Sequence, residues 1–251
     1  MTMTATSITE IPPLRHREAM ARAATEYDRF VAAVERLQPD DWSRQTDNDQ
    51  WDVKAVVAHV LGMMKMNASI REMARQRSIS GKAAKQSGAF PIDELTGLQV
   101  REHVSLSPSE LTAAVRRTAP KALKGRSRTP ALVRAMPMDP GPPTEGKWKL
   151  GYLLDVILTR DTWMHRIDMC RATGRELVVT GDHDGRIVAD VVAEWARTHG
   201  RPFTLVLTGP AGGTYTQGEG GERHELDAVE FCRILSGRGT GTGLLTQGVP
   251  F

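Results

Sequence analysis

Apolar residues recur at intervals of three and four along much of the first two-thirds of the chain. Between residues 14 and 37 they stand at positions 20, 23, 24, 27, 30, 31, 34 and 37. This spacing places the apolar side chains on one face of an α-helix. A helix of this kind buries that face against other elements, so the pattern predicts a layer or bundle of helices.

Further helices are indicated by similar stripes and by helix-start signals. Asp52 is a plausible N-cap for a helix that we expect to reach about Arg77. Ser107-Pro108-Ser109-Glu110 has the form of a capping box. The remaining helices are expected over 93–103, 150–173 and 182–199, with Gly174 and Gly200 as C-caps.

Three segments are expected to interrupt this helical pattern. Ser78–Ala89 has few apolar residues, which predicts a mobile loop and a candidate lid. Pro120 is expected to kink or end the helix that begins after Ser107. Gly125–Lys147 is rich in Pro, Gly, Arg and Met, which predicts a long connection.

After Gly200 the sequence pattern changes from one typical of helices to one typical of strands and turns. Phe203–Leu207 is typical of a strand, a Gly-rich turn follows it, and Thr214–Gln217 is a candidate returning strand. A short helix is expected from Leu226 to Leu235. These patterns predict an α+β chain, with an antiparallel helix bundle over residues 1–175 and a small α+β domain over 176–251. Short loops between adjacent helices favour up-and-down packing.

Composition excludes several classes of protein. Lys and Arg exceed Asp and Glu by only 33 to 30 in 251 residues, too diffuse an excess to predict a nucleic-acid partner. No apolar run approaches the ~18 residues of a membrane span, so no membrane partner is expected. Residues 1–13 lack the pattern of a secretory signal. Two cysteines, Cys170 and Cys232, exclude a disulfide framework and predict a reducing, cytoplasmic location.

Common catalytic motifs are missing from the sequence. It contains no G-x-S-x-G elbow, P-loop or dinucleotide-binding fingerprint. The glycines between Gly209 and Gly213 surround a proline and precede no helix, so they indicate a turn and not a phosphate-binding loop.

The residues with the clearest potential for chemistry are two histidines. Of the seven in the chain, only His59 and His165 lie inside expected helices that are largely apolar. Asp161 precedes His165 by four residues, so both leave the same helix face. Asp168, three residues after His165, extends that face and could orient the imidazole or pair with an arginine. Such a row of ionisable side chains is costly to bury unless the side chains are paired or bind a cation.

Two readings of this row remain open. A hydrogen-bonded core histidine or a surface ion pair would satisfy it without a metal. Alternatively, His59, Asp161 and His165 are three ligands with one coordination position left open, which is the pattern of a catalytic zinc site. Nickel, iron and manganese are alternative ions for this donor set.

Two of these segments resemble parts of a known group of proteins. Trp51–Val60 is similar to the second-helix signature of the DinB-like metalloenzyme superfamily, in which a Trp precedes an apolar helix that carries a ligand His. Thr159–Asp168 resembles the later helix of its mycothiol-dependent maleylpyruvate isomerase branch. The last third is similar to the small C-terminal domain of that branch, which is related to sterol-carrier folds.

The resemblance implies a DinB-like four-helix bundle whose metal triad falls on His59, Asp161 and His165. Many members have Glu at the position of Asp161, and Asp is one methylene shorter. The family also uses an arginine from its C-terminal domain, and Arg238 is the best match. The implied cofactors are a divalent metal, with zinc first, and mycothiol.

The implied activity is a cis–trans isomerisation or an S-transfer on small electrophilic substrates that bear a carboxylate. A metal-bound thiol would lose its proton near neutral pH and add to an activated double bond. Two alternatives remain: a small-molecule or lipid binding protein with a vestigial metal site, and a zinc hydrolase with a bound water as nucleophile. The substrate and the oligomeric state are left open.

Overall fold

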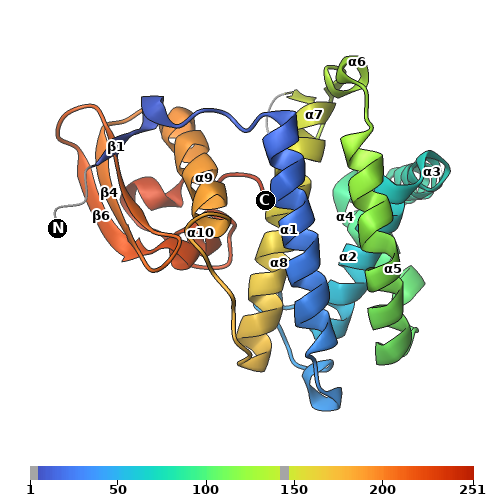
Figure 1. The fold of residues 1–251 in the computed structure, drawn as a ribbon. Helices are drawn as coiled ribbons and strands as arrows, with labels where there is room; N and C mark the ends of the chain where they lie inside the picture. Colours follow the sequence, from blue (N-terminus) through green and yellow to red (C-terminus); the bar gives the residue numbers. More distant parts are fainter. Residues whose placement is uncertain (1–4, 142–146) are drawn as a thin grey trace. The chain divides into compact units, whose positions relative to one another are not determined.

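The computed structural model describes residues 5–141 and 147–251, which fall into two compact units (Figure 1). Arg15–Leu177 forms the helical unit, and Val178–Phe251 together with Met1–Leu14 forms the mixed unit. The sequence-based boundary kept the first residues with the helices. The structure instead pairs β1 (Thr6–Ser7) with a strand of the mixed unit, because Thr6 and Ser7 lie in parallel register with Tyr215 and Thr216.

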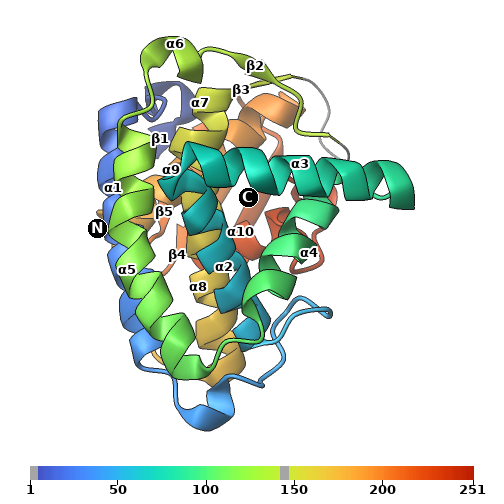
Figure 2. The ribbon, with the colours of Figure 1, turned by 90° about the vertical axis from the view of Figure 1, so that its right-hand side faces the viewer.

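The helical unit is built around a four-helix bundle. Its helices are α1 (His16–Glu35), α2 (Val53–Ala68), α3 (Ile70–Ser87), α4 (Pro91–His103), α5 (Pro108–Ser127), α6 (Ala131–Arg134), α7 (Leu150–Tyr152) and α8 (Leu158–Thr173). α1 and α2 each pack against both α5 and α8. α1 and α8 run in one direction, and α2 and α5 in the other (Figures 1 and 2). The expected α+β class with an antiparallel bundle is confirmed.

The order of the bundle helices differs from simple up-and-down packing. α3 lies across the end of α2, and α4 returns the chain to the end from which α2 started (Figure 2). Because of this excursion, α2 and α5 pack side by side in parallel. Their buried face and those of α1 and α8 supply the bundle core, which includes Tyr27, Phe30, Val57, Leu61, Met64, Leu111, Val115 and Leu158.

Two glycines allow close approach to α2. A Cβ on Gly125 of α5 would lie 2.0 Å from the carbonyl oxygen of Asn67 in α2. A Cβ on Gly62 of α2 would lie 2.6 Å from the Cβ of Gln99 in α4. Any side chain at either position would therefore push neighbouring helices apart.

The predicted loop at Ser78–Ala89 is wrong. The helix predicted from the Asp52 N-cap is confirmed at its start, but it ends at Ala68 and not near Arg77. The chain leaves the helix at Ser69, which has extended backbone angles, and the Ser69 side chain accepts a hydrogen bond from the Glu72 amide at 3.3 Å. This N-cap starts the new helix α3, which continues through Ser87 and ends at left-handed Gly88. The polar residues over 78–87 include good helix formers, so a low apolar content did not indicate a loop.

Helix α5 begins at the predicted capping box, with reciprocal bonds between Ser107 and Glu110. Pro120 does not end it, and the helix continues to Ser127 because buried Ala119 and Ala122 keep it packed on the bundle. The expected connection over Gly125–Lys147 therefore begins as helix and contains α6 and β2 (Pro137–Met138), which pairs with β3 (Trp148–Lys149). Residues 142–146 of that segment lie outside the described residues.

The expected helix over 150–173 contains one turn of π-helix, η3 (Leu153–Ile157), between α7 and α8. Buried Arg126 of α5 donates to the Leu154 carbonyl from Nε at 2.9 Å and from Nη2 at 2.6 Å. Its Nη2 also donates to Thr159 Oγ1 at 2.7 Å, and its Nη1 donates to the Tyr27 hydroxyl at 3.0 Å. One guanidinium thus links α1, α5, the π turn and α8.

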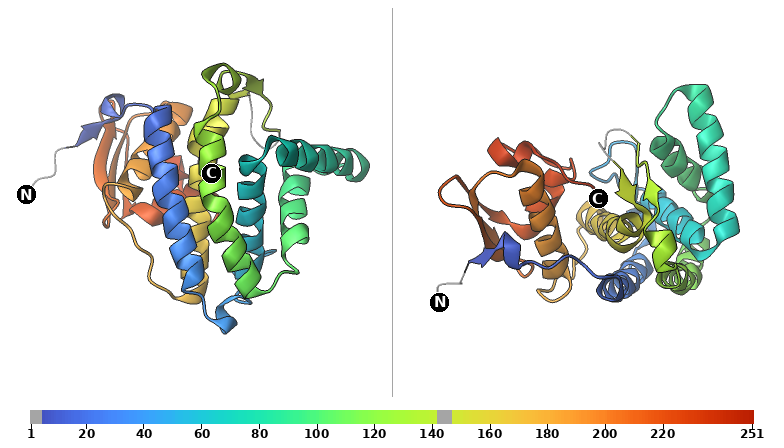
Figure 3. Two further views of the ribbon diagram at one scale, coloured as in Figure 1. Left: turned by 45° about the vertical axis from the view of Figure 1, so that its right-hand side comes forward. Right: turned by 90° about the horizontal axis from the view of Figure 1, so that it is seen from above.

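The mixed unit is a small sheet with helices on one face (Figure 3). Its strands β4 (Phe203–Thr208), β5 (Gly213–Gln217) and β6 (Glu222–Asp227) join β1 in the order β1-β5-β4-β6. Buried Phe203, Leu205 and Leu207 alternate along β4. Trp195 of α9 (Asp184–His199) packs against Phe203 and against Phe231 of α10 (Ala228–Leu235), with ring centroids 4.8 and 5.4 Å apart.

Strand β6 was missed by the sequence analysis. Its sequence, ERHELD, lacks the apolar alternation that marks a half-buried strand. It pairs in parallel with β4, which supplies the backbone hydrogen bonds that define it. Among the residues that the structure describes, no helix has the length and apolar content that crossing a bilayer would need.

Candidate metal centre

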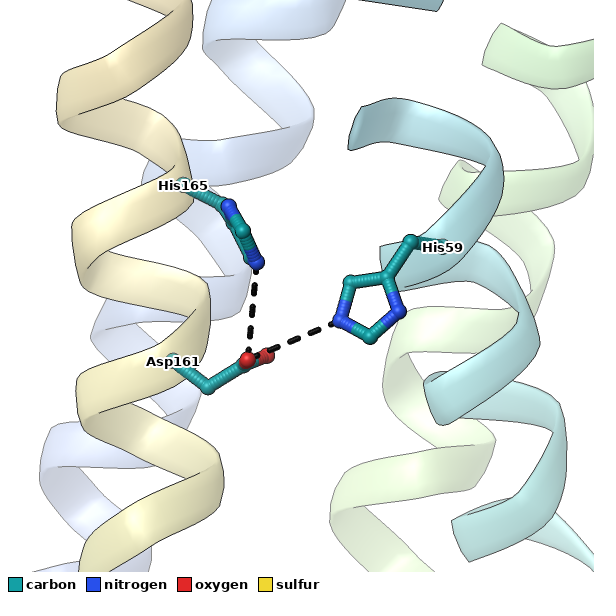
Figure 4. A group of neighbouring side chains, drawn as sticks. All are labelled: His59, Asp161 and His165. Atoms are coloured by element: carbon teal, nitrogen blue, oxygen red, sulfur yellow. Dashed lines mark ion pairs between the residues drawn. The ribbon is translucent and has the colours of Figure 1, made fainter. Parts of the chain in front are cut away.

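Two bundle helices bring the predicted site residues together (Figure 4). His59 lies in the middle of α2, while Asp161 and His165 lie one helical turn apart on α8. Since residues four apart share a helix face, the sequence itself places Asp161 beside His165. The packing of α2 on α8 adds His59 from the opposite side.

Asp161 lies at the same short distance from both imidazoles. Asp161 Oδ1 lies 3.5 Å from His59 Nε2 and 3.5 Å from His165 Nε2. One ligand atom from each residue lies within 4.8 Å of the other two. Both ion-pair distances exceed the 2.7–3.2 Å that N–H···O hydrogen bonds favour. The side chains converge without closing on one another.

The cluster also contains buried atoms without partners. His59 and His165 are 4% and 5% exposed, and the Asp161 side chain is 21% exposed. Within the described part of the chain, His59 Nδ1 and Asp161 Oδ2 are buried and accept or donate no hydrogen bond. Buried polar atoms are normally paired, so Asp161 Oδ2 has room for a further partner, whereas His59 Nδ1 points away from the Nε2 that faces Asp161.

The charges of the cluster are strongly coupled. Burial by itself would raise the pKa of Asp161, but the imidazoles of His165 and His59 hold that pKa well below its usual range. Burial would lower the pKa of His165, but the carboxylates of Asp161 and Asp168 overcome it and raise that pKa to about 9. Asp161 is therefore an anion, and the cluster favours a positive charge beside it.

Further side chains surround the cluster. Asp168 is fully buried, and its Oδ2 lies 3.1 Å from His165 Nδ1. With an Nδ1 proton donated to Asp168, loss of the second ring proton to an incoming cation would leave the Nε2 lone pair of His165 facing Asp161 and His59. Trp51 packs on both imidazoles, with ring centroids 4.9 Å from His59 and 5.8 Å from His165. Next to His165, buried Arg166 donates to Glu26 of α1 at 2.6 and 3.1 Å, which ties α8 to α1.

The donor set fits a divalent cation. Four ligands at about 2.0–2.1 Å in tetrahedral geometry stand roughly 3.3 Å from one another, close to the spacing between Asp161 and each imidazole. Two imidazoles and one carboxylate suit zinc and neighbouring transition metals better than magnesium or calcium. Such an ion would also give Asp161 Oδ2 a partner. That these three residues bind a cation stays a prediction.

The fourth predicted site residue, Arg238, belongs to the mixed unit. It follows the C-terminus of α10 and left-handed Gly237. Its amide donates to the Arg233 carbonyl at 2.8 Å, and its carbonyl accepts from Arg233 Nη2 at 3.1 Å. This local bonding sets its backbone.

Sequence reasoning missed the roles of Trp51 and Arg126. Trp51 was identified as part of a motif, but its spacing does not reveal that it contacts both histidines. Arg126 was not singled out, because nothing local marks an arginine whose partners lie 28 and 33 residues later in the chain. The π turn that Arg126 supports also has no sequence signal of its own.

Comparison with known proteins agrees with this architecture. Residues 23–170 match the family described as the mycothiol maleylpyruvate isomerase N-terminal domain. Two crystal structures of a mycothiol-dependent maleylpyruvate isomerase, one of them a mutant, are similar in fold. Each has 15% sequence identity and a TM-score of 0.59, and the match covers 94% of this chain and 93% of the other. No curated protein gave a match. Since the family match spans more than half of the 251 residues, this chain belongs to the mycothiol maleylpyruvate isomerase family.

Proposed function

We propose that this protein is a metal-dependent enzyme that uses mycothiol as its thiol cofactor. Its reaction is a cis–trans isomerisation of the maleylpyruvate isomerase type or a thiol S-transfer, on small electrophilic substrates that carry a carboxylate. The observation that carries this proposal is the convergence of His59, Asp161 and His165 from two helices at metal-ligand spacing.

In this proposal the three residues hold a divalent ion, with zinc as the first expectation. Three protein ligands leave one position for an exogenous ligand, as in catalytic zinc sites. When bound, the ion would lower the pKa of a coordinated thiol, so that the thiolate nucleophile is present at neutral pH. Asp161 contributes the negative charge that a cation requires in a buried site.

The surrounding residues keep the donors in place. Asp168 accepts from His165 Nδ1 and so directs the Nε2 lone pair toward the proposed ion. The buried Arg166–Glu26 pair holds the helix turn that carries His165. We propose that Arg238 binds the substrate carboxylate, a role that a planar guanidinium suits and that the family resemblance suggests.

Elemental analysis of protein purified without chelators tests the metal. We expect close to one transition-metal ion per chain, and a sharp loss of it in His59→Ala and in Asp161→Asn. A matched control is His103→Gln, because His103 is also a buried histidine of the helical unit but bonds to Gln99 and Lys65. The proposed metal site would be contradicted if wild-type protein contained no metal. It would also be contradicted if His59→Ala kept native helical content and an unchanged metal content.

Thiol dependence tests the chemistry. Turnover of a carboxylate-bearing electrophile should require mycothiol, and Arg238→Ala should lower turnover while the metal content stays constant. Turnover that persists without thiol would instead indicate a hydrolase. Tight binding of small apolar molecules by protein that lacks stoichiometric metal would indicate a binding protein.

A further inference from the structure

Trp51 lies where the loop after α1 meets α2. It directly precedes Asp52, whose Oδ1 caps α2 by accepting from the Ala55 amide at 2.8 Å. The indole contacts the imidazole of His59, which lies on the helix that Trp51 precedes, and the imidazole of His165, which lies on α8. The ring centroids of the two imidazoles are 5.1 Å apart, and their planes are at 74° to each other. All three separations fall in the range of aromatic contacts. A single ring therefore touches a donor from each helix.

The backbone at Trp51 is held by four hydrogen bonds to the preceding loop. Its carbonyl accepts from Thr46 Oγ1 at 2.7 Å, from Gln45 Nε2 at 3.0 Å and from the Thr46 amide at 3.3 Å. Its own amide donates to the Asn48 carbonyl at 3.0 Å. Three donors from residues 45 and 46 converge on this one carbonyl oxygen and restrain its position. The loop thus holds Trp51 in place, although the indole is only partly buried.

The two histidines differ in what orients their rings. His165 Nδ1 lies 3.1 Å from the Asp168 carboxylate, which sets the ring angle. His59 Nδ1 is buried without a hydrogen bond among the described residues. A metal-ligating histidine usually has its second nitrogen bonded to a partner that fixes it. For His59, packing must replace that bond, and Trp51 supplies an aromatic contact 4.9 Å away.

We propose that Trp51 is a positioning residue of the metal centre: its indole, held by the loop over 45–51, braces the His59 imidazole against the second ligand helix in place of a hydrogen bond. This inference rests on the metal-binding role proposed above. It assigns Trp51 a role in metal affinity and ligand geometry that a residue of the bundle core would not have.

The test uses the full chain and Co²⁺ as the probe. Trp51→Ala should weaken Co²⁺ binding by roughly 10- to 100-fold, as for other partners that orient a ligand histidine, and should change the visible absorption of the bound ion. Trp51→Phe keeps a ring at the same place and should restore most of the affinity and the wild-type spectrum. Trp148→Ala is the matched control, since this partly buried indole of the helical unit packs on Tyr152.

A fluorescence measurement covers the case in which Trp51→Ala fails to fold. Bound Co²⁺ should quench wild-type tryptophan emission, and the quenching should be smaller in Trp51→Phe, which has lost the indole beside the ion but keeps Trp163 of α8. Equal Co²⁺ affinity and spectrum in folded Trp51→Ala, or equal quenching in Trp51→Phe, would overturn the inference and leave the metal centre intact. Failure of the wild-type chain to bind Co²⁺ would overturn both.

Discussion

At the scale of single residues, the missing side chain of Gly125 decides how closely α5 approaches α2. The nearest atom to a Cβ at this position is a backbone carbonyl oxygen at 2.0 Å, which cannot rotate away as a flexible side chain could. Gly81 in α3 offers a contrast, because nothing lies within 4 Å of the Cβ it would carry. The two positions are both helical but differ in whether neighbours require glycine.

Gly125→Ala should destabilise the protein by about 1–3 kcal/mol, because the added methyl overpacks the contact between the two helices. Gly81→Ala should leave stability unchanged or raise it by roughly 0.5–1 kcal/mol through better helix propensity. Chemical denaturation of both variants checks the pair. Equal effects of the two substitutions would mean that the close approach at Gly125 does not limit the packing.

At the scale of elements, α8 is held by polar contacts as well as by its apolar face. Arg126 bonds to the π turn and to Thr159, two residues before Asp161, and Arg166 bonds to Glu26 of α1. Apolar contacts alone are non-directional and tolerate sliding or rotation of a helix. Directional bonds at both ends of the ligand-bearing segment therefore fix which residues of α8 face α2.

Arg126→Met should lower stability by about 1–3 kcal/mol, because it leaves the buried Leu154 carbonyl without its donor. The same variant would also lose the hydrogen bond to Thr159 that helps to set the rotation of α8, so it should bind metal more weakly. Arg126→Lys can restore one bond and should be intermediate in both properties. The measurements are the free energy of unfolding and a metal competition titration; a stability loss with unchanged metal affinity would contradict the positioning argument.

Helices α3 and α4 are joined by a group of ion pairs centred on Arg75. Arg75 donates to Glu72 at 2.6 and 2.8 Å and to Glu102 of α4 at 2.6 and 2.7 Å. The bonds from Arg75 lower the pKa of Glu72 to about 2, and they also lower the pKa of Glu102. A carboxyl whose folded-state pKa is depressed stabilises the fold above its unfolded pKa and loses that contribution as pH falls.

These ion pairs predict that the free energy of unfolding is larger for wild type than for Glu72→Gln at pH 6. This difference should shrink between about pH 4.5 and pH 2. The difference should be only about 1 kcal/mol, because Arg75 is 40% exposed and solvent screens the interaction. Thermal unfolding across that pH range checks it, with Arg75→Met and the double variant closing a cycle. A constant difference at all pH values would contradict the assigned coupling.

At the scale of the whole molecule, the proposed ion would join α2 to α8 within the helical unit only. A ligand that binds the folded state alone stabilises it by about 2.7 kcal/mol when its free concentration is 100 times the dissociation constant. Zn²⁺ should therefore slow amide hydrogen exchange in α2 and α8 and leave β4–β6 unaffected. His59→Ala, with or without Zn²⁺, should behave as the metal-free wild type; protection that appears equally in both units would contradict a local site.

Much of this architecture follows from local rules. The stripe over 14–37, the capping box at Ser107 and the glycines at 174 and 200 predicted helices and ends that the structure contains. The predictions failed where a single cap or a distant strand decided the outcome. Ser69 divides one expected helix into two, and β6 exists because β4 pairs with it.

The sequence by itself determined that Asp161 and His165 share a helix face, because a spacing of four residues has that consequence in any α-helix. The tertiary structure alone decided that His59, about a hundred residues earlier, stands opposite them. It also decided that Trp51 covers both imidazoles and that Arg126 sets the register of α8. Periodicity acts within one helix, whereas the choice of neighbours and the rotation of each helix depend on close packing and buried hydrogen bonds between distant segments.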